Sequence, residues 1–406
     1  MTGDRLTHLG EVGALLWPAP LTVDTGAGPA PAGTRVHREF LLLPDRRRPR
    51  LLVPPGRRPA AAAVRRYGEG RGRLARWGAV GLSVAGRLGV AQVLLHDRVR
   101  VHLPAAQAAA GIEEHLAAVL GREVLVSMHL GPPRANRKPV LQLLSPAGET
   151  FAFVKVGVDP LTCRLVRAEG AALDTLAAAG LTAVTAPRAL HRGQWRGLEL
   201  LVQSALPVWR HRRPLTAELV QRAQREVAAI GGTPAGALAA SAYWAQLTDR
   251  VAALPVSPAA GELAALLPAL AASAGDVELT LGAWHGDWTP WNSAAVGGTL
   301  MVWDWERFDT GVPAGFDAVH LELQTDLVNR LADPRASAER CLATAAAVLA
   351  PLGLSARQAE VTAMTYLAEL ATRYLGDRQS EAGARLGDVG AWLLPALRAR
   401  LEEEPC

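Results

Sequence analysis

The chain has 406 residues, and at about 150 residues per domain this length predicts two or three domains. Half of the residues are apolar and a fifth are charged, which excludes a wholly disordered chain. The net charge is +5. Three cysteines, Cys163, Cys341 and Cys406, lie far apart, which argues against a disulfide scaffold and against a cysteine-based zinc site.

No targeting or membrane segment is expected. The first twenty residues lack a basic head followed by an apolar run, so they predict no signal peptide. The most apolar span, residues 77–95, is only about 19 residues long and contains Arg87 and four glycines, so no membrane helix is expected. We therefore expect a cytoplasmic protein, whose oligomeric state the sequence leaves open.

The positive charge is concentrated near the N-terminus. Residues 1–120 contain 17 Arg and nine acidic residues, and residues 44–76 alone contain 11 Arg. Such a segment is either a solvated basic face or a docking surface for an anionic partner, such as nucleic acid, a membrane surface or a phosphorylated substrate. Within residues 44–76, Tyr67 is the only aromatic residue, and Trp77 directly follows this segment, which disfavours binding to single-stranded nucleic acid.

Lysine is rare in this chain. Of 43 cationic residues, 41 are Arg, and the two lysines are Lys138 and Lys155. An ammonium group is a compact point charge, whereas a guanidinium group is broad and planar. A retained lysine can therefore indicate a function, although two lysines can also survive by chance.

In chain order, the first part of the sequence predicts loose structure and then short elements. Residues 1–38 are rich in Gly, Pro and Thr and predict loose order. Two short strands are expected at 40–44 and 51–53, and a mostly helical stretch at 60–95. A short helix is expected at 112–120, where Gly121 would end it.

The middle of the chain predicts a sheet, and the rest predicts helices. Three apolar runs at 124–130, 140–144 and 151–156 are separated by turn signals and predict strands. A helix at 165–179 and a strand at 198–202 follow. From residue 214 onward apolar residues recur mainly at helical spacing. The order predicts an antiparallel sheet with one helix, followed by a helical half.

One segment combines the residue types that phosphoryl transfer requires. Residues 285–292 read His-Gly-Asp-Trp-Thr-Pro-Trp-Asn, and residues 302–306 read Val-Trp-Asp-Trp-Glu. The reaction needs a carboxylate for the proton of the attacking hydroxyl, oxygen ligands for Mg²⁺ and a cation on the phosphates. Asp287 and Asn292 lie five residues apart on a predicted loop, and a hairpin would return Asp304 to it.

These motifs resemble the aminoglycoside phosphotransferase and choline kinase group of small-molecule kinases, whose loop reads His-Gly-Asp-x-x-x-x-Asn. The resemblance covers about residues 122–390. It implies that Asp287 is the catalytic base, that His285 supports the loop, and that Asn292 and Asp304 are Mg²⁺ ligands. It also implies that Asp317 caps or braces the helix that follows.

The resemblance further implies a nucleotide site for ATP. A strand lysine should pair with a helix glutamate, and Lys155 ends the third predicted strand while Glu169 lies 14 residues later. Adenine is expected against backbone groups where residues 198–203 meet residues 204–206, so Gln203 and Ala205 are candidate nucleotide-binding residues.

The fold implied is of the α+β class: a two-lobed protein-kinase-like fold, preceded by an extra N-terminal α/β region. Its antiparallel-sheet N-lobe would contain one helix, and its C-lobe would be mostly helical. The predicted domains are an Arg-rich extension at 1–120, a nucleotide-binding N-lobe at 121–205, and a C-lobe at 206–406 with the catalytic loop and the acceptor site.

Two departures from the resemblance matter. The loop at 131–138 contains one glycine, and its Arg137 and Lys138 either hold phosphates by side chain or form an exposed hairpin tip. His-Gly-Asp instead of His-Arg-Asp, and the short stretch after Asp304, argue against a protein kinase.

The surroundings of the loop leave two questions open. Five of the eleven tryptophans either pack beneath the loop or form an aromatic wall for a sugar ring or a cation. They are Trp284, Trp288, Trp291, Trp303 and Trp305. Four acidic residues either attract an amine-bearing acceptor or form a solvated face. They are Glu306, Asp309, Glu322 and Asp326.

The sequence therefore predicts an ATP-dependent kinase that phosphorylates a hydroxyl of a small molecule. Aminoglycoside, other sugar, choline-like and amino-acid-derived acceptors all remain open, as does the choice between ATP and GTP. One alternative is a catalytically silent kinase-like module that binds nucleotide or a partner and docks through the Arg-rich segment. A third possibility is nucleic-acid association through residues 44–76, which the composition does not favour.

Overall fold

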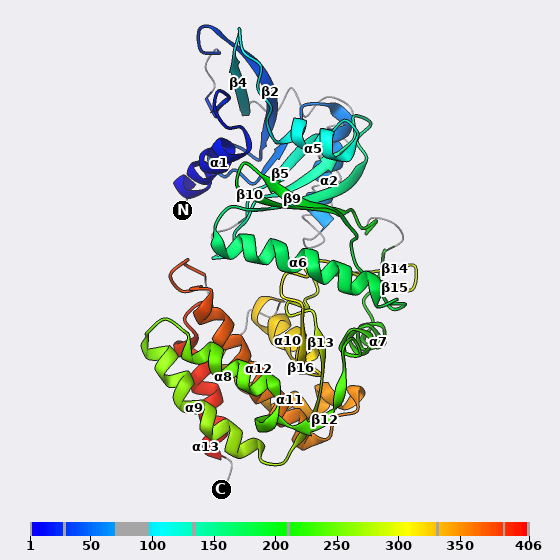
Figure 1. Ribbon diagram of the computed structural model, residues 1–406, viewed down its shortest axis with the longest axis vertical. Helices are drawn as coiled ribbons and strands as arrows, with labels where there is room; N and C mark the ends of the chain where they lie inside the picture. Colours follow the sequence, from blue (N-terminus) through cyan, green and yellow to red (C-terminus); the bar gives the residue numbers. More distant parts are fainter. Residues whose placement is uncertain are drawn as a thin grey trace. The chain divides into compact units, whose positions relative to one another are not determined.

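The computed structural model describes residues 2–26, 30–69, 97–131, 135–208, 212–329, 333–384 and 386–403. The fold is mixed α and β, and the chain forms two compact units. The first unit comprises Met1–Pro132, Arg137–Val166 and Arg188–Trp209; the second comprises Pro133–Asn136, Arg167–Pro187 and Arg210–Cys406. Figure 1 labels the elements.

Among the described residues, the first unit contains a nine-stranded antiparallel sheet in the order β1-β4-β2-β3-β5-β6-β7-β10-β9. The strands are β1 (Thr22–Asp24), β2 (Thr34–Leu43), β3 (Leu51–Val53), β4 (Arg98–Pro104), β5 (Leu125–His129), β6 (Val140–Leu144), β7 (Thr150–Gly157), β9 (Ala189–Trp195) and β10 (Leu198–Ser204). Every predicted strand is present, and β1, β4 and β9 are additional.

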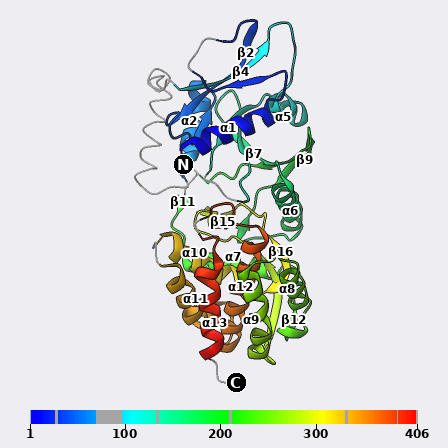
Figure 2. The same ribbon diagram turned by 90° about the vertical axis from the view of Figure 1, so that its left-hand side faces the viewer.

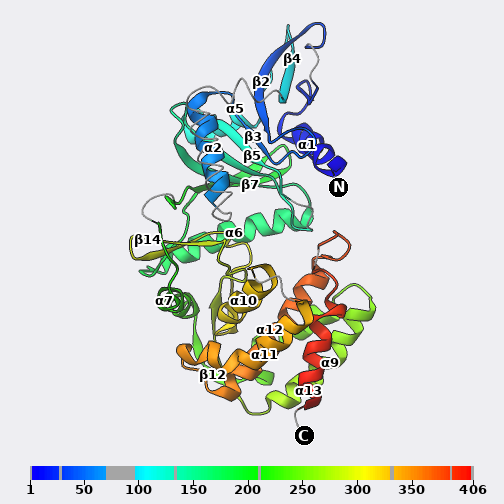
Figure 3. The same cartoon turned by 180° about the vertical axis from the view of Figure 1, so that it is seen from behind.

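Helices cover both faces of this sheet. Helix α1 (Thr2–Leu16) and helix α5 (Ile112–Leu120) contribute to one apolar core, and helix α2 (Arg57–Glu69) contributes to another on the opposite face. Figure 1 shows α5 in front of the sheet, and the view from behind in Figure 3 shows α2 in front of it. Gly121 ends α5 in the left-handed conformation, as predicted. Helix α6 (Pro160–Ala178) is divided between the two units.

The expectation of loose order for residues 1–38 is wrong. Residues 2–16 form α1, and residues 34–43 form β2. Leu9, Val12 and Leu16 follow each other at helical spacing, and all three are buried in the core. Their burial outweighs the turn-forming composition around them. The sequence predicts a helical stretch at 60–95. Helix α2 contains the first part of it, to Glu69, and residues 70–96 lie outside the described residues.

The predicted domain boundary at residue 120 lies within one sheet. Strand β3 pairs with β5, which places Leu51 opposite His129 and Leu52 opposite Met128. The same core contains Leu9 from α1 and buried residues of β5, β6, β7 and β10. Residues 1–120 and strands β5, β6, β7, β9 and β10 thus share a sheet and a core, and the first unit extends without a break from Met1 to Pro132.

Removal of residues 1–120 is therefore expected to damage the first unit. It would leave β5 as an unpaired edge strand and expose the core that α1 covers, and both changes favour aggregation. Solubility and thermal unfolding of a chain that starts at Gly121 would test this. A soluble truncated chain with a cooperative transition for the remaining strands would contradict it.

A buried carboxyl group in the first unit predicts a pH dependence of stability. Glu113 is 3% exposed, and its Oε2 accepts a hydrogen bond of 2.8 Å from Trp17 Nε1. Burial raises the pKa of Glu113 to about 7, although the Trp17 hydrogen bond opposes the rise. The folded state binds the proton of Glu113 more tightly than the unfolded state does. The contribution of Glu113 to the free energy of unfolding is therefore greatest below about pH 4.5 and falls as the pH rises to about 7.

Replacing Glu113 by Gln keeps an acceptor for Trp17 and removes the ionisation. We expect the variant to match the wild type near pH 4 and to be more stable by about 3 kcal/mol near pH 8. Unfolding measured across this range tests the prediction, with Glu123→Gln as an exposed control. Parallel pH profiles for wild type and Glu113→Gln would contradict it.

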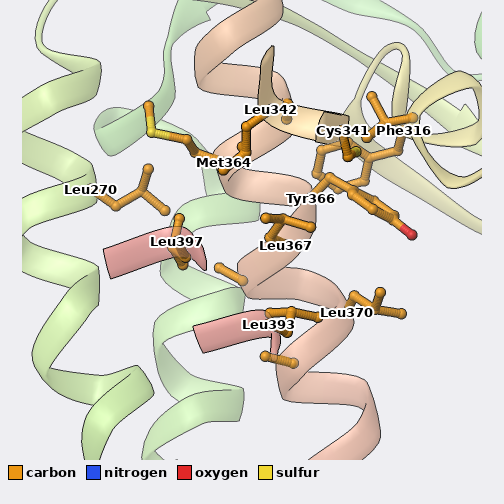
Figure 4. Close-up of a cluster of buried hydrophobic side chains, with 14 of the residues drawn as sticks. Leu270, Phe316, Cys341, Leu342, Met364, Tyr366, Leu367, Leu370, Leu393 and Leu397 are labelled. Carbon is orange, nitrogen blue, oxygen red and sulfur yellow. The ribbon is translucent and has the colours of Figure 1, made fainter. Parts of the chain in front are cut away.

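The second unit is mostly helical, as expected. Its helices are α7 (Ala217–Ala228), α8 (Ala242–Ala252), α9 (Pro258–Ala274), α10 (Phe316–Gln324), α11 (Pro334–Leu349), α12 (Ala356–Gly376) and α13 (Leu393–Glu403). Side chains of Thr216, Ser241, Ser257, Asp333 and Ser355 cap five of them by accepting from a backbone amide of the first turn. Helix α12 lies among α9, α11 and α13 (Figure 2), and its apolar residues fill the core (Figure 4).

Two small sheets accompany these helices among the described residues. One has the order β11-β14-β15-β8, with β11 (Arg212–Arg213), β14 (Ser293–Val296), β15 (Thr299–Val302) and β8 (Val184–Thr185). The other has the order β12-β13-β16, with β12 (Thr233–Ala237), β13 (Glu278–Trp284) and β16 (Asp309–Pro313). No helix within the described parts of the chain is both long and apolar enough to cross a membrane.

Candidate active site

Two strand arrangements hold the loop that carries the phosphotransfer motif. Strand β13 ends at Trp284, directly before the loop, and pairs with β16. Strands β14 and β15 form a hairpin after it, with Gly297 and Gly298 at positive φ in the turn. The amide of Trp303 donates to the carbonyl of Asn292 at 3.1 Å, so the hairpin returns the chain beside the loop. Asp304 follows immediately.

Asp287 is the acidic residue of the loop, and its carboxylate contacts two polar side chains. Its Oδ2 accepts a hydrogen bond of 3.0 Å from Asn292 Nδ2, and its Oδ1 lies 3.2 Å from His320 Nε2. Its side chain remains 42% exposed, whereas His320 is fully buried. Two side chains thus hold the carboxylate, and part of it remains accessible to solvent.

The electrostatic surroundings keep Asp287 ionised. Partial burial raises its pKa, but the hydrogen bond from His320 and the positive charge of Arg373 outweigh this effect and lower the pKa to about 2. At neutral pH the group is therefore a carboxylate that can accept a hydrogen bond or a proton.

His285 connects the two parts of the site. Its Nδ1 accepts from the amide of Asp287 at 3.1 Å, and its Nε2 lies 2.9 Å from the carbonyl of Trp303. Burial lowers the pKa of His285 to about 4, so the ring is neutral and Nε2 carries the proton. His285 therefore joins the loop of Asp287 to the residue that precedes Asp304.

Asp317 holds the loop from helix α10. Its Oδ2 accepts from the amide of His285 at 2.7 Å and its Oδ1 accepts from the amide of Gly286 at 3.1 Å. Burial raises the pKa of Asp317 to about 7 against the effect of these hydrogen bonds. The expectation that it caps its own helix is wrong, because Gly315 is the N-cap and no side chain caps this end.

Gly286 explains why this loop reads His-Gly-Asp. It adopts a φ of +79°, and a Cβ there would lie 2.3 Å from the carbonyl oxygen of Arg307. The carbonyl of Gly286 accepts a hydrogen bond from Arg373 on α12. A larger residue at position 286 would therefore displace the backbone that supports Asp287.

Asp304 and Asn292 have the donor types that suit a hard divalent cation. Asn292 donates through Nδ2 to the backbone carbonyl and to Oδ2 of Asp287, which leaves its Oδ1 as a potential ligand. Asp304 adopts a φ of +67°, a conformation that costs energy for a residue other than glycine and is typical of functional sites. The described residues contain no group of three or more His, Cys, Asp or Glu suited to a metal. A cation here would thus need oxygens from a phosphate or water as well.

Two of the predicted nucleotide-binding residues, Lys155 and Gln203, lie on one face of the sheet of the first unit. Lys155 on β7 is opposite Leu201 on β10, and Gln203 is opposite Phe153, so these side chains point to the same side. Lys155 is 2% exposed and Gln203 is 5% exposed, and Gln203 Oε1 has no hydrogen-bond partner. An orphaned buried acceptor beside a buried lysine fits a ligand that supplies a donor.

The remaining predicted residues are placed as follows. The amide of Ala205 donates to the carbonyl of Phe151 at 3.0 Å. Glu169 is buried on α6. Arg137 and Lys138 are half-buried in the segment before β6. The pairing of Lys155 with Glu169 and the binding of phosphates by Arg137 and Lys138 stay predictions.

Most of the tryptophans around the loop are packing residues. Trp284, Trp288 and Trp305 are buried, and the ring centroids of His285 and Trp305 lie 4.5 Å apart. Trp291 and Trp303 are half-buried. Packing beneath the loop therefore accounts for three of the five, and these three cannot form a wall for an acceptor.

Two of the acidic residues near the loop are also not on a solvated face. Glu306 is 9% exposed and accepts a hydrogen bond of 3.1 Å from Asn136, and Asp326 is 2% exposed and forms an ion pair with Arg340.

The structure adds residues that the motif did not indicate. His320 and Arg373 both contact the loop, and they come from α10 and α12. A third, Arg66 on α2, lies over the ring of Phe153 at 5.3 Å from its centroid, on the same face of the sheet as Lys155. No sequence signal indicated these residues: His320 lies one helical turn after Asp317, but nothing in the sequence connects it with Asp287.

No protein-family model and no curated protein matches the sequence. Solved structures to which the chain is similar include an aminoglycoside phosphotransferase, APH(4)-Ia, in a ternary complex with AMP-PNP and hygromycin B. That match has 13% identity, covers 72% of this chain and 98% of the other, and has a TM-score of 0.48.

Two further similar structures are kinases of the same general kind. The gentamicin complex of APH(2″)-IIa has 13% identity, covers 74% of this chain and 98% of the other, and has a TM-score of 0.40. A glucosamine kinase has 20% identity, covers 75% of this chain and 85% of the other, and has a TM-score of 0.33. At these values the similarity by itself assigns neither activity nor substrate to this chain.

Proposed function

We propose that this protein is a kinase that transfers the γ-phosphate of ATP to a hydroxyl of a small molecule. One observation carries the proposal. The accessible carboxylate of Asp287 is held by His320 and Asn292. Asp304 directly follows Trp303, whose amide donates to the carbonyl of Asn292. The carboxylate proposed as the base and the two proposed oxygen ligands thus come from one loop and the hairpin after it, which supports the proposal.

The residues of the second unit suggest how the reaction proceeds. Asp287 accepts a hydrogen bond from the acceptor hydroxyl, orients it, and takes its proton as the oxygen–phosphorus bond forms. The bond between the γ-phosphorus and the β–γ bridging oxygen breaks, and ADP leaves with that oxygen. Asn292 and Asp304 would hold Mg²⁺, whose charge would neutralise that of the phosphates. His285, Asp317 and Arg373 keep the loop in place.

The residues of the first unit are proposed to bind the nucleotide. Lys155 is proposed to neutralise phosphate charge, and its pairing with Glu169, a residue of the second unit, remains a prediction from the sequence. Gln203 and the carbonyl of Ala205 contact the base, and Arg137 and Lys138 contact phosphates. We propose that the whole chain is a two-lobed protein-kinase-like fold, in which residues 1–120 are an N-terminal addition to the first lobe.

The acceptor is proposed only as a class: an aminoglycoside, another sugar, a choline-like amine or an amino-acid derivative. A metabolite library incubated with the protein, ATP and Mg²⁺ and examined by mass spectrometry tests this. We expect one acceptor class to gain a phosphate with matching ATP consumption. No phosphorylated product from any class would contradict the proposal.

Nucleotide binding gives a further prediction. Since Asn292 and Asp304 supply oxygen ligands for a hard cation, ATP should raise the melting temperature much more with Mg²⁺ than with a chelator. At ligand concentrations of about 100 times Kd the stabilisation is about 2.7 kcal/mol. Thermal unfolding with ATP in Mg²⁺ and in EDTA measures the difference. Equal shifts in both buffers would argue against the metal site.

A further inference from the structure

One buried histidine is not explained by the mechanism above. His320 lies on α10, three residues after Asp317, so both side chains are on the same face of this helix. Asp317 binds backbone amides of the loop, whereas His320 reaches the side chain of Asp287. The same helical turn thus holds the loop at its backbone and at its carboxylate.

The hydrogen-bond chemistry assigns the proton on His320. An ionised carboxylate can only accept, so the 3.2 Å contact with Asp287 Oδ1 requires a proton on Nε2. Nδ1 of the neutral ring then carries a lone pair, and Tyr366 must donate its hydroxyl hydrogen across the 2.8 Å contact. Burial lowers the pKa of His320 against the effect of Asp287 and so favours the neutral ring, and burial raises the pKa of Tyr366 and so favours its hydroxyl.

Tyr366 is buried where its hydroxyl can make this contact. It is fully buried on α12, and its ring lies edge-on to Phe316 with centroids 5.7 Å apart. Figure 4 shows the ring within the apolar cluster and the hydroxyl oxygen directed away from Leu367 and Leu393. The hydroxyl therefore belongs to the His320 contact, and the apolar cluster fixes its position.

We propose that His320 is a positioning residue for Asp287: its Nε2–H holds one carboxylate oxygen, and the hydroxyl of Tyr366 donates to Nδ1 and holds the ring in place. Asn292 holds the other oxygen, so the plane of the carboxylate is fixed. A fixed plane directs the remaining lone pairs toward the acceptor hydroxyl, and correct orientation is a large part of catalysis. This inference rests on the proposed phosphotransferase function.

A pair of substitutions separates the two ring nitrogens. The amide nitrogen of Gln reaches about as far as Nε2, whereas that of Asn reaches only as far as Nδ1. We expect His320→Gln to keep kcat within a few-fold. His320→Asn should lose about 10–100-fold in kcat with little change in the KM for ATP, as expected for a lost hydrogen bond to a charged group.

Tyr366→Phe tests the support of the ring without altering His320. It should lower kcat, because Nδ1 loses its hydrogen-bond partner and the ring is held only at Nε2. Tyr243→Phe is the matched control, because Tyr243 is also buried and donates to Glu369 at 2.9 Å, away from the loop. The control should lower stability and leave kcat unchanged.

The tautomer is read directly by NMR on the full chain with ¹⁵N-labelled histidine, and the His320→Gln spectrum assigns the signal. We expect a neutral, Nε2-protonated ring in the wild type and a changed signal in Tyr366→Phe. A proton on Nδ1 in the wild type, or equal kcat for His320→Gln and His320→Asn, would overturn the inference alone. Absence of turnover in the wild type with every acceptor would instead overturn the proposed function, on which the inference rests.

Discussion

Replacing Asp287 by Asn is expected to lower turnover by about 10²–10⁴-fold, because the variant cannot take the proton of the acceptor hydroxyl. The affinity for Mg²⁺-ATP should change little, since Asp287 is proposed to contact the acceptor. The measurement is kcat and KM for both substrates, together with ATP affinity by calorimetry.

The hydrogen bonds around Asp287 make a stability control necessary. Both carboxylate oxygens have donors as neighbours, Asn292 and His320, and an amide can accept at only one position. The variant should therefore lose some stability, and activity must be assayed well below its melting temperature. Asp333→Asn is a suitable control, because it removes a negative charge but keeps an N-cap for α11. Wild-type turnover in Asp287→Asn would refute the assignment of the base.

Replacing Asp304 by Asn is expected to impair ATP affinity and turnover together and to raise the Mg²⁺ concentration needed for activity. A ligand of a metal that bridges phosphates acts on both binding and chemistry. Removal of a residue that only supports a metal ligand typically lowers metal affinity or activity by about 10–100-fold. The loss of activity in Asp304→Asn should be larger than this.

The backbone makes Asn the right substitute at position 304. Asp304 has a φ of +67°, and Asn tolerates this left-handed region well. The substitution therefore changes charge without adding strain, and a small change in melting temperature is expected. Mg²⁺ titrations of activity at fixed ATP measure the effect. An unchanged Mg²⁺ requirement would show that Asp304 serves only the fold of the hairpin.

The sequence predicted the parts of the site that are close in the chain. Asp287 and Asn292 are five residues apart on one loop, and the Gly297-Gly298 turn indicated the hairpin that returns Asp304. Local signals also located β5, β6, β7 and α5. Apolar runs separated by turn signals indicated the strands, and a terminal glycine indicated the end of the helix, and each of these signals spans only a few residues.

The supports of the site depend on tertiary packing and were not predictable. His320 lies 33 residues from Asp287, and Tyr366 lies 46 residues from His320. No spacing rule connects helices that meet only after folding. Helix α1 was missed for a related reason: its apolar face is stable because it covers a sheet whose strands come later in the chain.

The central claim is that Asp287 serves as the base of a phosphotransferase whose nucleotide carries Mg²⁺. The most direct test is mass detection of phosphorylated product from the same acceptor, with wild type and Asp287→Asn compared at equal saturation with Mg²⁺-ATP. We predict product with the wild type and about 10²–10⁴-fold less with the variant, although both bind nucleotide. Equal product formation by the two proteins would contradict the account.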